Sequence, residues 1–447
     1  MERAYRTQWA QLLAPKRRTA DGIRLDSMDS VRTPFLADHD RIVFSSSFRR
    51  LGRKTQVHPL VRNDHIHNRL THSLEVSCVG RSLGLCVGEE LRREGHLPEG
   101  FTPEHVGQIL QAACLAHDIG NPPFGHAGEE AIRDWFAEAS KGPYFRELSP
   151  ACVADFVCFD GNAQGFRVIN ALENNKDRGG LRLTFPVIAS LVKYPCSAYE
   201  AQGRGRCKFN FYTAERDLFT QIFATLGLTD GAKWVRHPLS WLLEAADDIC
   251  YRIIDMEDAR ELGIINYEDF TQVMASLLSD EERDEPRLQA MDSDRRRAGM
   301  LRTVAMGRII PSVARTFKER YAQIMSGDLE GSLLEHAHDD VAGFMQAAAA
   351  VFHKKIMNDA QKTALEIGTY ALYRRLLDVF IPACFHHVHN VAMSYQETRA
   401  ITLMGANAPM PQEDTYGAYL RVLDFVAGMT DEYATFLSRQ FSGTTER

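Results

Sequence analysis

Several features that would assign the chain to a familiar class of protein are absent. Its 447 residues contain no run of 18 apolar residues and no N-terminal series of basic, apolar and small residues. We therefore expect neither a membrane-spanning helix nor a secretory signal. These two absences favour a cytoplasmic location. The lack of a glycine-rich phosphate loop argues against P-loop and dinucleotide-binding enzymes. A net charge of −7 argues against charge-driven binding of nucleic acid, so basic residues must act in local clusters.

The cysteines exclude two further roles. The nine cysteines include no Cys-x-x-Cys pair, which argues against a structural zinc site and a disulfide framework. Cys78, Cys86, Cys114 and Cys250 fall within apolar helical patterns. We therefore expect reduced thiols in the core.

Helical periodicity of apolar residues dominates the chain and predicts a mainly α fold. One pair of strands is predicted in 198–213, with a turn at Gly203 and Gly205. The length exceeds that of a typical single core, so we expect one large domain with an extension or two packed domains. The segment 279–297 is nearly all charged and predicts a solvated linker or mobile loop, with the junction between core and extension shortly before it.

The dipeptide His117-Asp118 stands at the end of an apolar helical run, residues 109–116. Burial of these polar side chains requires a hydrogen-bonding partner or a metal. Two other His-Asp dipeptides, at 39–40 and 338–339, lie in charged segments and favour structural roles.

The chain is predicted to turn sharply after this dipeptide. Gly120 is expected to provide a left-handed helix cap, and two consecutive prolines at 122–123 cannot continue a helix. A new helix opening at Gly125 would direct His126 and Glu129 back toward the same place, since residues three apart share a helix face.

Two other helices offer ligands for a metal at this site. His72 precedes an apolar helical run, and Asp247 belongs to an acidic pair within an otherwise apolar helix. With His117 and Asp118 they would form a set of two nitrogen and two oxygen ligands, which suits Mn²⁺, Fe²⁺ or Mg²⁺. Ordinary hydrogen bonding of buried His and Asp remains the alternative from spacing alone.

Other polar residues are open to two interpretations. His65 and His67 could hold a second metal, but a surface loop is favoured. Basic residues suited to phosphate occur at Arg49, Arg50, Arg53, Lys54, Arg69 and Lys193. Of these, Arg53 and Lys54 are assigned to a solvated helix face.

Seven blocks between residues 32 and 434 occur in a characteristic order. They are RTPFLADHDRIVFSSSFRRLGRKTQV, NRLTHSLEVSCVGRSL, AACLAHDIGNPPFGHAGEEAI, FDGNAQGFRVINALE, LTFPVIASLVKYP, HPLSWLLEAADDICYRIIDMEDA and DFVAGMTDEYA. Together they resemble the bacterial deoxyguanosine triphosphate triphosphohydrolase (dGTPase) family of the HD-domain phosphohydrolases. HDIGNPPFGHAGE and EAADDICY are the most specific, and the charged segment 279–297 matches no pattern of the family.

The resemblance implies an HD-domain helical core with a helical C-terminal extension. Residues 1–64 would contribute substrate-site residues, 65–270 would form the core, and 271–447 would form the C-terminal helical region, with its charged linker near 279–297. A homo-oligomer, often a hexamer, is implied as well. An activating dNTP and single-stranded DNA are further partners that the resemblance leaves open.

The resemblance also implies roles for individual residues. The tyrosine of the family follows its metal aspartate by four positions, here Tyr251, which makes Asp247 rather than Asp248 the ligand. The implied metal ligands are His72, His117, Asp118 and Asp247, and the implied catalytic pair is His126 and Glu129. Implied substrate contacts are Arg50, Arg69, Lys193 and Tyr194 at the phosphates, Gln56, Tyr251 and Asp255 near the deoxyribose, and Asn121.

The implied reaction is metal-dependent hydrolysis of dNTPs to deoxynucleoside and intact triphosphate, by attack of activated water on the α-phosphorus. His126, held by Glu129, would protonate the departing 5′-oxygen. Two alternatives remain: an HD phosphohydrolase acting on another phosphoester, and a nucleotide-regulated or single-stranded nucleic-acid-binding HD oligomer.

Overall fold

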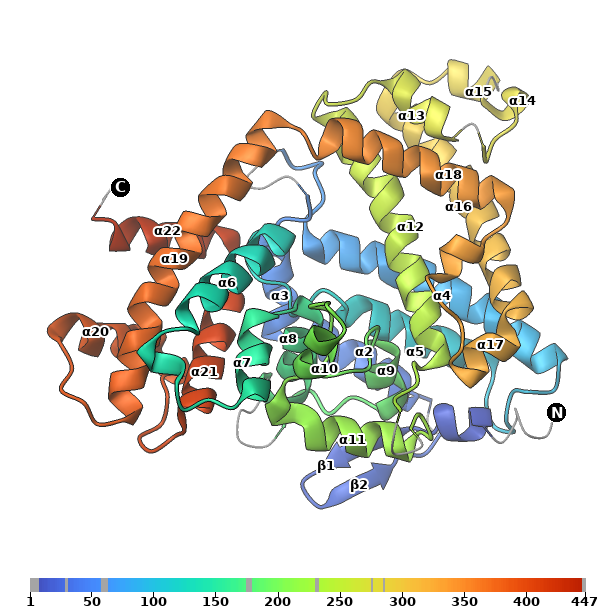
Figure 1. The fold of residues 1–447 in the computed structure, drawn as a ribbon. Coiled ribbons are helices and arrows are strands. Elements are labelled where there is room, and N and C mark those ends of the chain that lie inside the picture. Colours follow the sequence, from blue (N-terminus) through green and yellow to red (C-terminus); the bar gives the residue numbers. More distant parts are fainter. Residues whose placement is uncertain are drawn as a thin grey trace.

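The computed structural model describes residues 8–28, 31–57, 63–173, 179–229, 233–274, 276–283 and 286–443. Regular structure in these ranges is almost entirely helical (Figure 1), which confirms the predicted fold class. The exception is one antiparallel hairpin formed by β1 (Lys16–Thr19) and β2 (Gly22–Leu25). In the same ranges no helix is both long and apolar enough to cross a membrane.

Three long helices form the centre of the fold, α4 (Arg69–Arg93), α5 (Pro103–Ala116) and α12 (Pro238–Glu261). Helices α4 and α5 pack closely because Gly84 faces Gly107, where a Cβ on Gly84 would lie 2.8 Å from the Cα of Gly107. Helix α12 packs across α4 and α2 (Pro34–Val43) covers α5 (Figure 1). This tight packing fixes the polar side chains that the three helices carry.

Local sequence determines where these helices begin. Asn68 and Thr71 form a capping box at the start of α4, in which the Asn68 side chain accepts backbone N–H groups of the first turn. Pro103 and Pro238 occupy first-turn positions of α5 and α12, where the missing N–H of proline costs nothing.

Further elements complete the part of the chain before residue 230. They are α3 (Ser46–Arg50), η1 (Leu51–Arg53), α6 (Gly125–Ala139), η2 (Pro143–Phe145), α7 (Pro150–Val157), α8 (Gly161–Arg167), η3 (Val168–Leu172), α9 (Phe185–Ser190), α10 (Ala198–Gly203), η4 (Thr213–Glu215) and α11 (Arg216–Thr225).

The C-terminal region is helical and includes three long helices, α16 (Asp294–Glu319), α18 (Asp339–Val351) and α19 (Ala360–Val388). Its other elements are α13 (Tyr267–Met274), α14 (Asp280–Arg283), α15 (Pro286–Gln289), α17 (Tyr321–Ser326), η5 (Leu333–His336), η6 (Phe352–Ile356), α20 (Tyr395–Met404), η7 (Gly405–Asn407), α21 (Thr415–Ala427) and α22 (Asp431–Phe441).

Two apolar clusters form the core. The larger is built on α4, α5, α9, α12 and α16. The second joins α6, α7 and α10 to α19, α21 and α22, and α19 lies beside α6 and α22 in Figure 1. The C-terminal helices are therefore packed directly on α6, the helix that begins with the sequence GHAGE.

The structure corrects the predicted strands in 198–213. This stretch begins with α10, because Ser197 and Glu200 form a capping box that favours a helix. Beyond α10, Phe211 makes only an isolated bridge to Ser197. The sheet of the described residues is instead the hairpin near the N-terminus.

The charged segment 279–297 also differs from the expected linker. It holds α14, α15 and the start of α16, and residues 284–285 lie outside the described residues. Leu288 is buried, and Arg295 pairs with Glu261 at the end of α12. Buried Leu288 and ion pairs that include Arg295–Glu261 and Glu282–Arg308 thus attach this highly charged stretch to the protein.

Candidate active site and metal centre

Helix α5 delivers His117 and Asp118 as predicted, at the end of a buried apolar rod. Nδ1 of His117 lies 2.7 Å from the carbonyl oxygen of Cys114, which can only accept, so Nδ1 carries the proton. In the neutral ring Nε2 then carries the lone pair, and this atom is buried without a hydrogen-bond partner among the described residues. This is the orientation of a metal-ligating histidine.

His72 of α4 and Asp247 of α12 converge on the same point. Oδ1 of Asp247 lies 3.0 Å from Nε2 of His72 and 3.4 Å from Nε2 of His117. Ligand atoms of these three residues all lie within 4.8 Å of one another. Oδ1 of Asp118 is 3.5 Å from Nε2 of His117. The helices therefore bring His72, His117 and Asp247 together, and Asp118 lies beside them but outside this three-residue group.

The charges in this cluster suit a divalent cation. Burial disfavours the ionised form of Asp247, but His117 and His72 hold its pKa well below the usual range. Burial likewise opposes ionisation of Asp118, and Arg69, with Nη1 2.9 Å from Oδ2, keeps its pKa low. Although burial favours the neutral ring, these carboxylates raise the pKa of His117 to about 9. A cation between them would replace that proton.

The neighbouring Asp248 is directed elsewhere. It is absent from the group of ligand atoms formed by His72, His117 and Asp247. Burial and then Asp247 raise the pKa of Asp248 to about 7, and Lys193 acts in the opposite direction. The register with Asp247 facing the histidines is the one implied by the resemblance.

The turn after Asp118 is built differently from the prediction. Gly120 is not left-handed; a Cβ there would lie 2.0 Å from the backbone nitrogen of Gly165, so glycine is needed for close approach to α8. The left-handed residues of this turn are Phe124, with φ of 64°, and Gly125, with φ of 54°. Gly125 follows, and a Cβ on it would lie 2.3 Å from Nη2 of Arg69.

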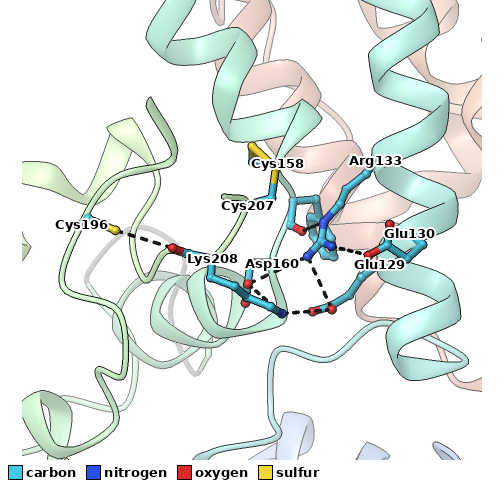
Figure 2. Close-up of a disulfide and its surroundings, with 9 residues drawn as sticks. Glu129, Glu130, Arg133, Cys158, Asp160, Cys196, Cys207 and Lys208 are labelled. Carbon is cyan, nitrogen blue, oxygen red and sulfur yellow. Dashed lines mark hydrogen bonds and ion pairs between the residues drawn. A yellow bond between two sulfur atoms is a disulfide. The ribbon is translucent and has the colours of Figure 1, made fainter. Parts of the chain in front are cut away.

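Helix α6 carries His126 and Glu129, one turn apart. Glu129 is buried and accepts the N–H of Gly161 at 2.7 Å. Lys208 and Arg133 flank its carboxylate at 3.7 and 3.6 Å, as Figure 2 shows. Burial opposes ionisation, but Lys208 and its other neighbours keep the pKa of Glu129 below the usual value. Desolvation lowers the pKa of His126, and the Glu129 charge acts against this shift.

Two cysteines near this pair depart from the expectation of reduced core thiols. Cys158 and Cys207 form a disulfide that joins the segments carrying Asp160 and Lys208 (Figure 2). Sequence could not indicate this pairing, since 49 positions separate the two residues. Of the four cysteines named above, Cys114 and Cys250 are buried free thiols, Cys86 is partly buried, and Cys78 is exposed.

A cavity of about 290 Å³ opens beside the metal cluster. Its far wall comes from η6 and α19 and includes Phe352, His353 and Lys362, which sequence reasoning did not identify. The predicted site residues that line it are Gln56, Arg69, Asp118, Asn121, His126, Asp247 and Tyr251.

Four of the predicted substrate contacts do not line this cavity. Arg50 lines an adjoining cavity of about 440 Å³. Lys193 pairs with Glu244 at 2.9 Å, and the backbone N–H of Tyr194 donates to Asn210. Asp255 is 1% exposed, and burial raises its pKa well above the usual range.

The structure also places His67 and Arg53, for which the sequence left a metal site or a solvated position open. His67 does not join the group of possible metal ligands found among the described residues; its Nδ1 lies 2.7 Å from Asp258. Arg53 is exposed, as expected, and pairs with Glu432.

Lys54 contradicts the prediction of a solvated side chain. It is 3% exposed, and its Nζ donates to the carbonyl oxygens of Asn121 and Ala427 at 2.6 and 2.7 Å. Burial, with Arg50 acting in the same direction, lowers its pKa to about 7. Nothing in the sequence around Arg49, Arg50 and Arg53 indicated that Lys54, alone among these neighbouring basic residues, would be buried.

Comparison with known proteins agrees with this geometry. Residues 69–152, which carry His72, His117, Asp118, His126 and Glu129, match the HD domain family. The chain is 46% identical to a deoxyguanosinetriphosphate triphosphohydrolase-like protein of Pseudomonas aeruginosa (strain LESB58), over 97% of this chain and 98% of the relative.

More distant relatives also cover most of the chain. A protein of the same name from Synechocystis sp. is 37% identical over 98% of this chain and 99% of the relative. A deoxyguanosinetriphosphate triphosphohydrolase of Klebsiella pneumoniae (strain 342) is 31% identical over 82% of this chain and 80% of the relative.

The helical core and its histidine–aspartate cluster define a phosphohydrolase of the HD-domain class, with residues able to bind a divalent metal. Within that class, the chain belongs to the deoxyguanosinetriphosphate triphosphohydrolase family.

Proposed function

We propose that the protein hydrolyses deoxynucleoside triphosphates to deoxynucleoside and intact triphosphate. The observation that carries this proposal is the convergence of the His72, His117 and Asp247 ligand atoms at the wall of a cavity that also exposes His126. A catalytic acid and a metal centre thus face one substrate-sized space. Membership of the dGTPase family supports a nucleotide substrate.

The orphaned Nε2 of His117 and the ionised carboxylates support a metal at this centre. A divalent metal held by His72, His117, Asp118 and Asp247, with Mn²⁺, Mg²⁺ or Fe²⁺ as candidates, would supply Lewis acidity and lower the pKa of a bound water.

The residues of the chain supply the rest of the mechanism. Arg69 lines the cavity, and its guanidinium group lies beside Asp118. From there the guanidinium can also contact a phosphate of the substrate. Water attacks the α-phosphorus, and the bond to the 5′-oxygen breaks. That oxygen is a poor leaving group, so His126 donates a proton to it, while ionised Glu129 stabilises the protonated ring.

Selection for deoxyribose is assigned to Tyr251, which lines the cavity with Gln56 and whose ring is tilted against that of Phe352, with 5.2 Å between the ring centroids. The aromatic ring would occupy the space that a 2′-hydroxyl requires. Asp255 lies one turn further along α12, is buried and has the Tyr251 side chain as a neighbour, so it is positioned to support this wall rather than to line it.

Replacing Tyr251 by alanine should open space for the 2′-hydroxyl. We expect the ratio of kcat/KM for dGTP to that for GTP to fall by on the order of 10-fold or more. Tyr251→Phe is the matched control, since it keeps the ring and should preserve the ratio. An unchanged ratio in the alanine variant would place sugar selection elsewhere.

A panel of four dNTPs and four NTPs, each with Mg²⁺ or Mn²⁺ and with chromatographic analysis of products, tests the proposed activity. We expect deoxynucleoside and triphosphate from one or more dNTPs. Inorganic phosphate released from other phosphoesters, with no dNTP turnover, would favour a different HD phosphohydrolase. Nucleotide or single-stranded DNA binding without turnover would favour a regulatory oligomer.

The same proposal includes assembly and location. We expect a homo-oligomer, with a hexamer favoured, located in the cytoplasm where dNTPs are used. Stimulation of one dNTP's hydrolysis by another in the panel would identify an activating nucleotide.

A further inference from the structure

The block DFVAGMTDEYA near the C-terminus has no role in the reaction described above. Its Asp431 is the first residue of α22 and is 2% exposed. Oδ2 accepts the backbone N–H of Thr55 at 2.8 Å, and Oδ1 accepts that of Phe124 at 3.0 Å. One buried carboxylate therefore joins two segments that are far apart in the sequence.

Both segments lead directly into the wall of the candidate active site. Thr55 precedes Gln56, and Phe124 lies two positions before His126; all four residues line the cavity beside the metal cluster. A residue that belongs to neither segment thus bonds to the backbone beside both Gln56 and His126.

The hydrogen bond to Phe124 is made where the backbone adopts an unfavourable conformation. Phe124 has φ of 64°, a left-handed conformation that residues other than glycine rarely adopt. It is the N-terminal flanking residue of α6, and its own side chain makes no capping hydrogen bond. A charged acceptor at its N–H favours the conformation that sets the direction of α6.

Hydrogen bonds of Lys54 form a second connection between the C-terminal helices and the active-site turn. Nζ of Lys54 donates to Asn121 in the turn and to Ala427 at the end of α21. The carbonyl oxygen of Lys54 accepts the N–H of Arg69 at 3.0 Å, which connects this segment to the start of α4. The C-terminal helices are therefore bonded to the backbone around Asn121, Phe124 and Arg69.

We propose that Asp431 is a positioning residue for the reaction, which holds the Gln56 and His126 walls of the cavity at their working separation. Lys54 provides a second tie between the C-terminal helices and the same turn. Asp431 touches neither the metal ligands nor the space for substrate, so its effect passes through the backbone of Thr55 and Phe124. This inference rests on the proposed function.

The test uses Asp431→Asn, which preserves the volume of the side chain. The amide has one oxygen, which can accept one of the two N–H groups, and its NH₂ group then faces the N–H of the other residue. We expect kcat on the best dNTP to fall about 10- to 100-fold, because small displacements of a catalytic group cost that much. KM and the Mn²⁺ content should change little. Hydrogen exchange followed by mass spectrometry should become faster in peptides that contain Thr55 and Phe124.

Two neighbouring carboxylates serve as matched controls. Glu432→Gln removes the next acidic residue, which is exposed and pairs with Arg53. Asp414→Asn alters an acidic cap of α21 that accepts only the nearby N–H of Gly417. Both should keep wild-type kcat and wild-type exchange at Thr55 and Phe124.

The possible outcomes are distinct. Wild-type kcat in folded Asp431→Asn, or a loss of kcat with unchanged exchange in both peptides, would overturn the proposal. If this variant does not fold, Lys54→Met tests the same connection between the C-terminal helices and the turn. A lower kcat with faster hydrogen exchange in residues 121–126 would support the proposal. Unchanged kcat and unchanged exchange would contradict it. Absence of dNTP hydrolysis in the wild type would count against the proposed function, while the exchange measurements would still test the positioning contacts.

Discussion

Replacing Asp247 by asparagine should remove the bound metal and reduce dNTP hydrolysis by more than about 100-fold. Even residues behind metal ligands change affinity or activity by about 10- to 100-fold, and Asp247 lies within 3.4 Å of both histidines of the cluster. Metal content of the purified variant, measured by mass spectrometry, and kcat/KM should fall together. Helical content should be preserved, because the change is confined to the site.

Asp248→Asn is the matched control for this prediction. It alters the adjacent carboxylate, which is absent from the ligand group and has Lys193 among its neighbours. This variant should retain the metal and lose much less activity. The reverse ranking of the two variants would shift the ligand by one residue and remove the basis for assigning Tyr251 to the sugar.

Replacing His126 by alanine should lower kcat about 10²- to 10⁴-fold, the usual contribution of a general acid, with little change in substrate binding. His126 lines the cavity, and its neighbour Glu129 is buried, ionised and held by Gly161 and Lys208. Single-turnover kinetics with separate measurement of the dNTP Kd would distinguish the two effects.

A leaving-group test makes this prediction sharper. A phosphoester with a nitrophenol leaving group needs no protonation, so the deficit of His126→Ala should shrink on that substrate. His338→Ala, in another His-Asp dipeptide of the chain, pairs with Glu319 away from the site and should behave as wild type. An equal deficit on both substrates would show that His126 does not act as the acid.

Much of the fold followed from periodicity and capping signals. The apolar run 109–116 and the breaks after it placed His117, Asp118 and the start of α6 correctly. The strands predicted in 198–213 failed because a local capping box at Ser197 outweighed the glycines. The disulfide depends on contacts between distant segments, which spacing along the chain does not encode.

The site was predictable where its residues lie on regular helices. The helical period brings Asp247 and Tyr251 to one face of α12, and both line the cavity. Sequence did not reveal Lys54 or Asp431, because their partners are backbone atoms of segments remote in the chain. Arg50 and Lys193 have suitable chemistry, but tertiary packing places Arg50 in an adjoining cavity and pairs Lys193 with Glu244.

Hydrolysis of a dNTP in ¹⁸O-labelled water shows which bond breaks. If water attacks the α-phosphorus and the 5′-oxygen departs with a proton from His126, triphosphate appears whole and carries the label, while the deoxynucleoside carries none. Pyrophosphate with deoxynucleoside monophosphate as primary products, or label in the 5′-hydroxyl, would rule out this mechanism even if the metal centre is correctly assigned.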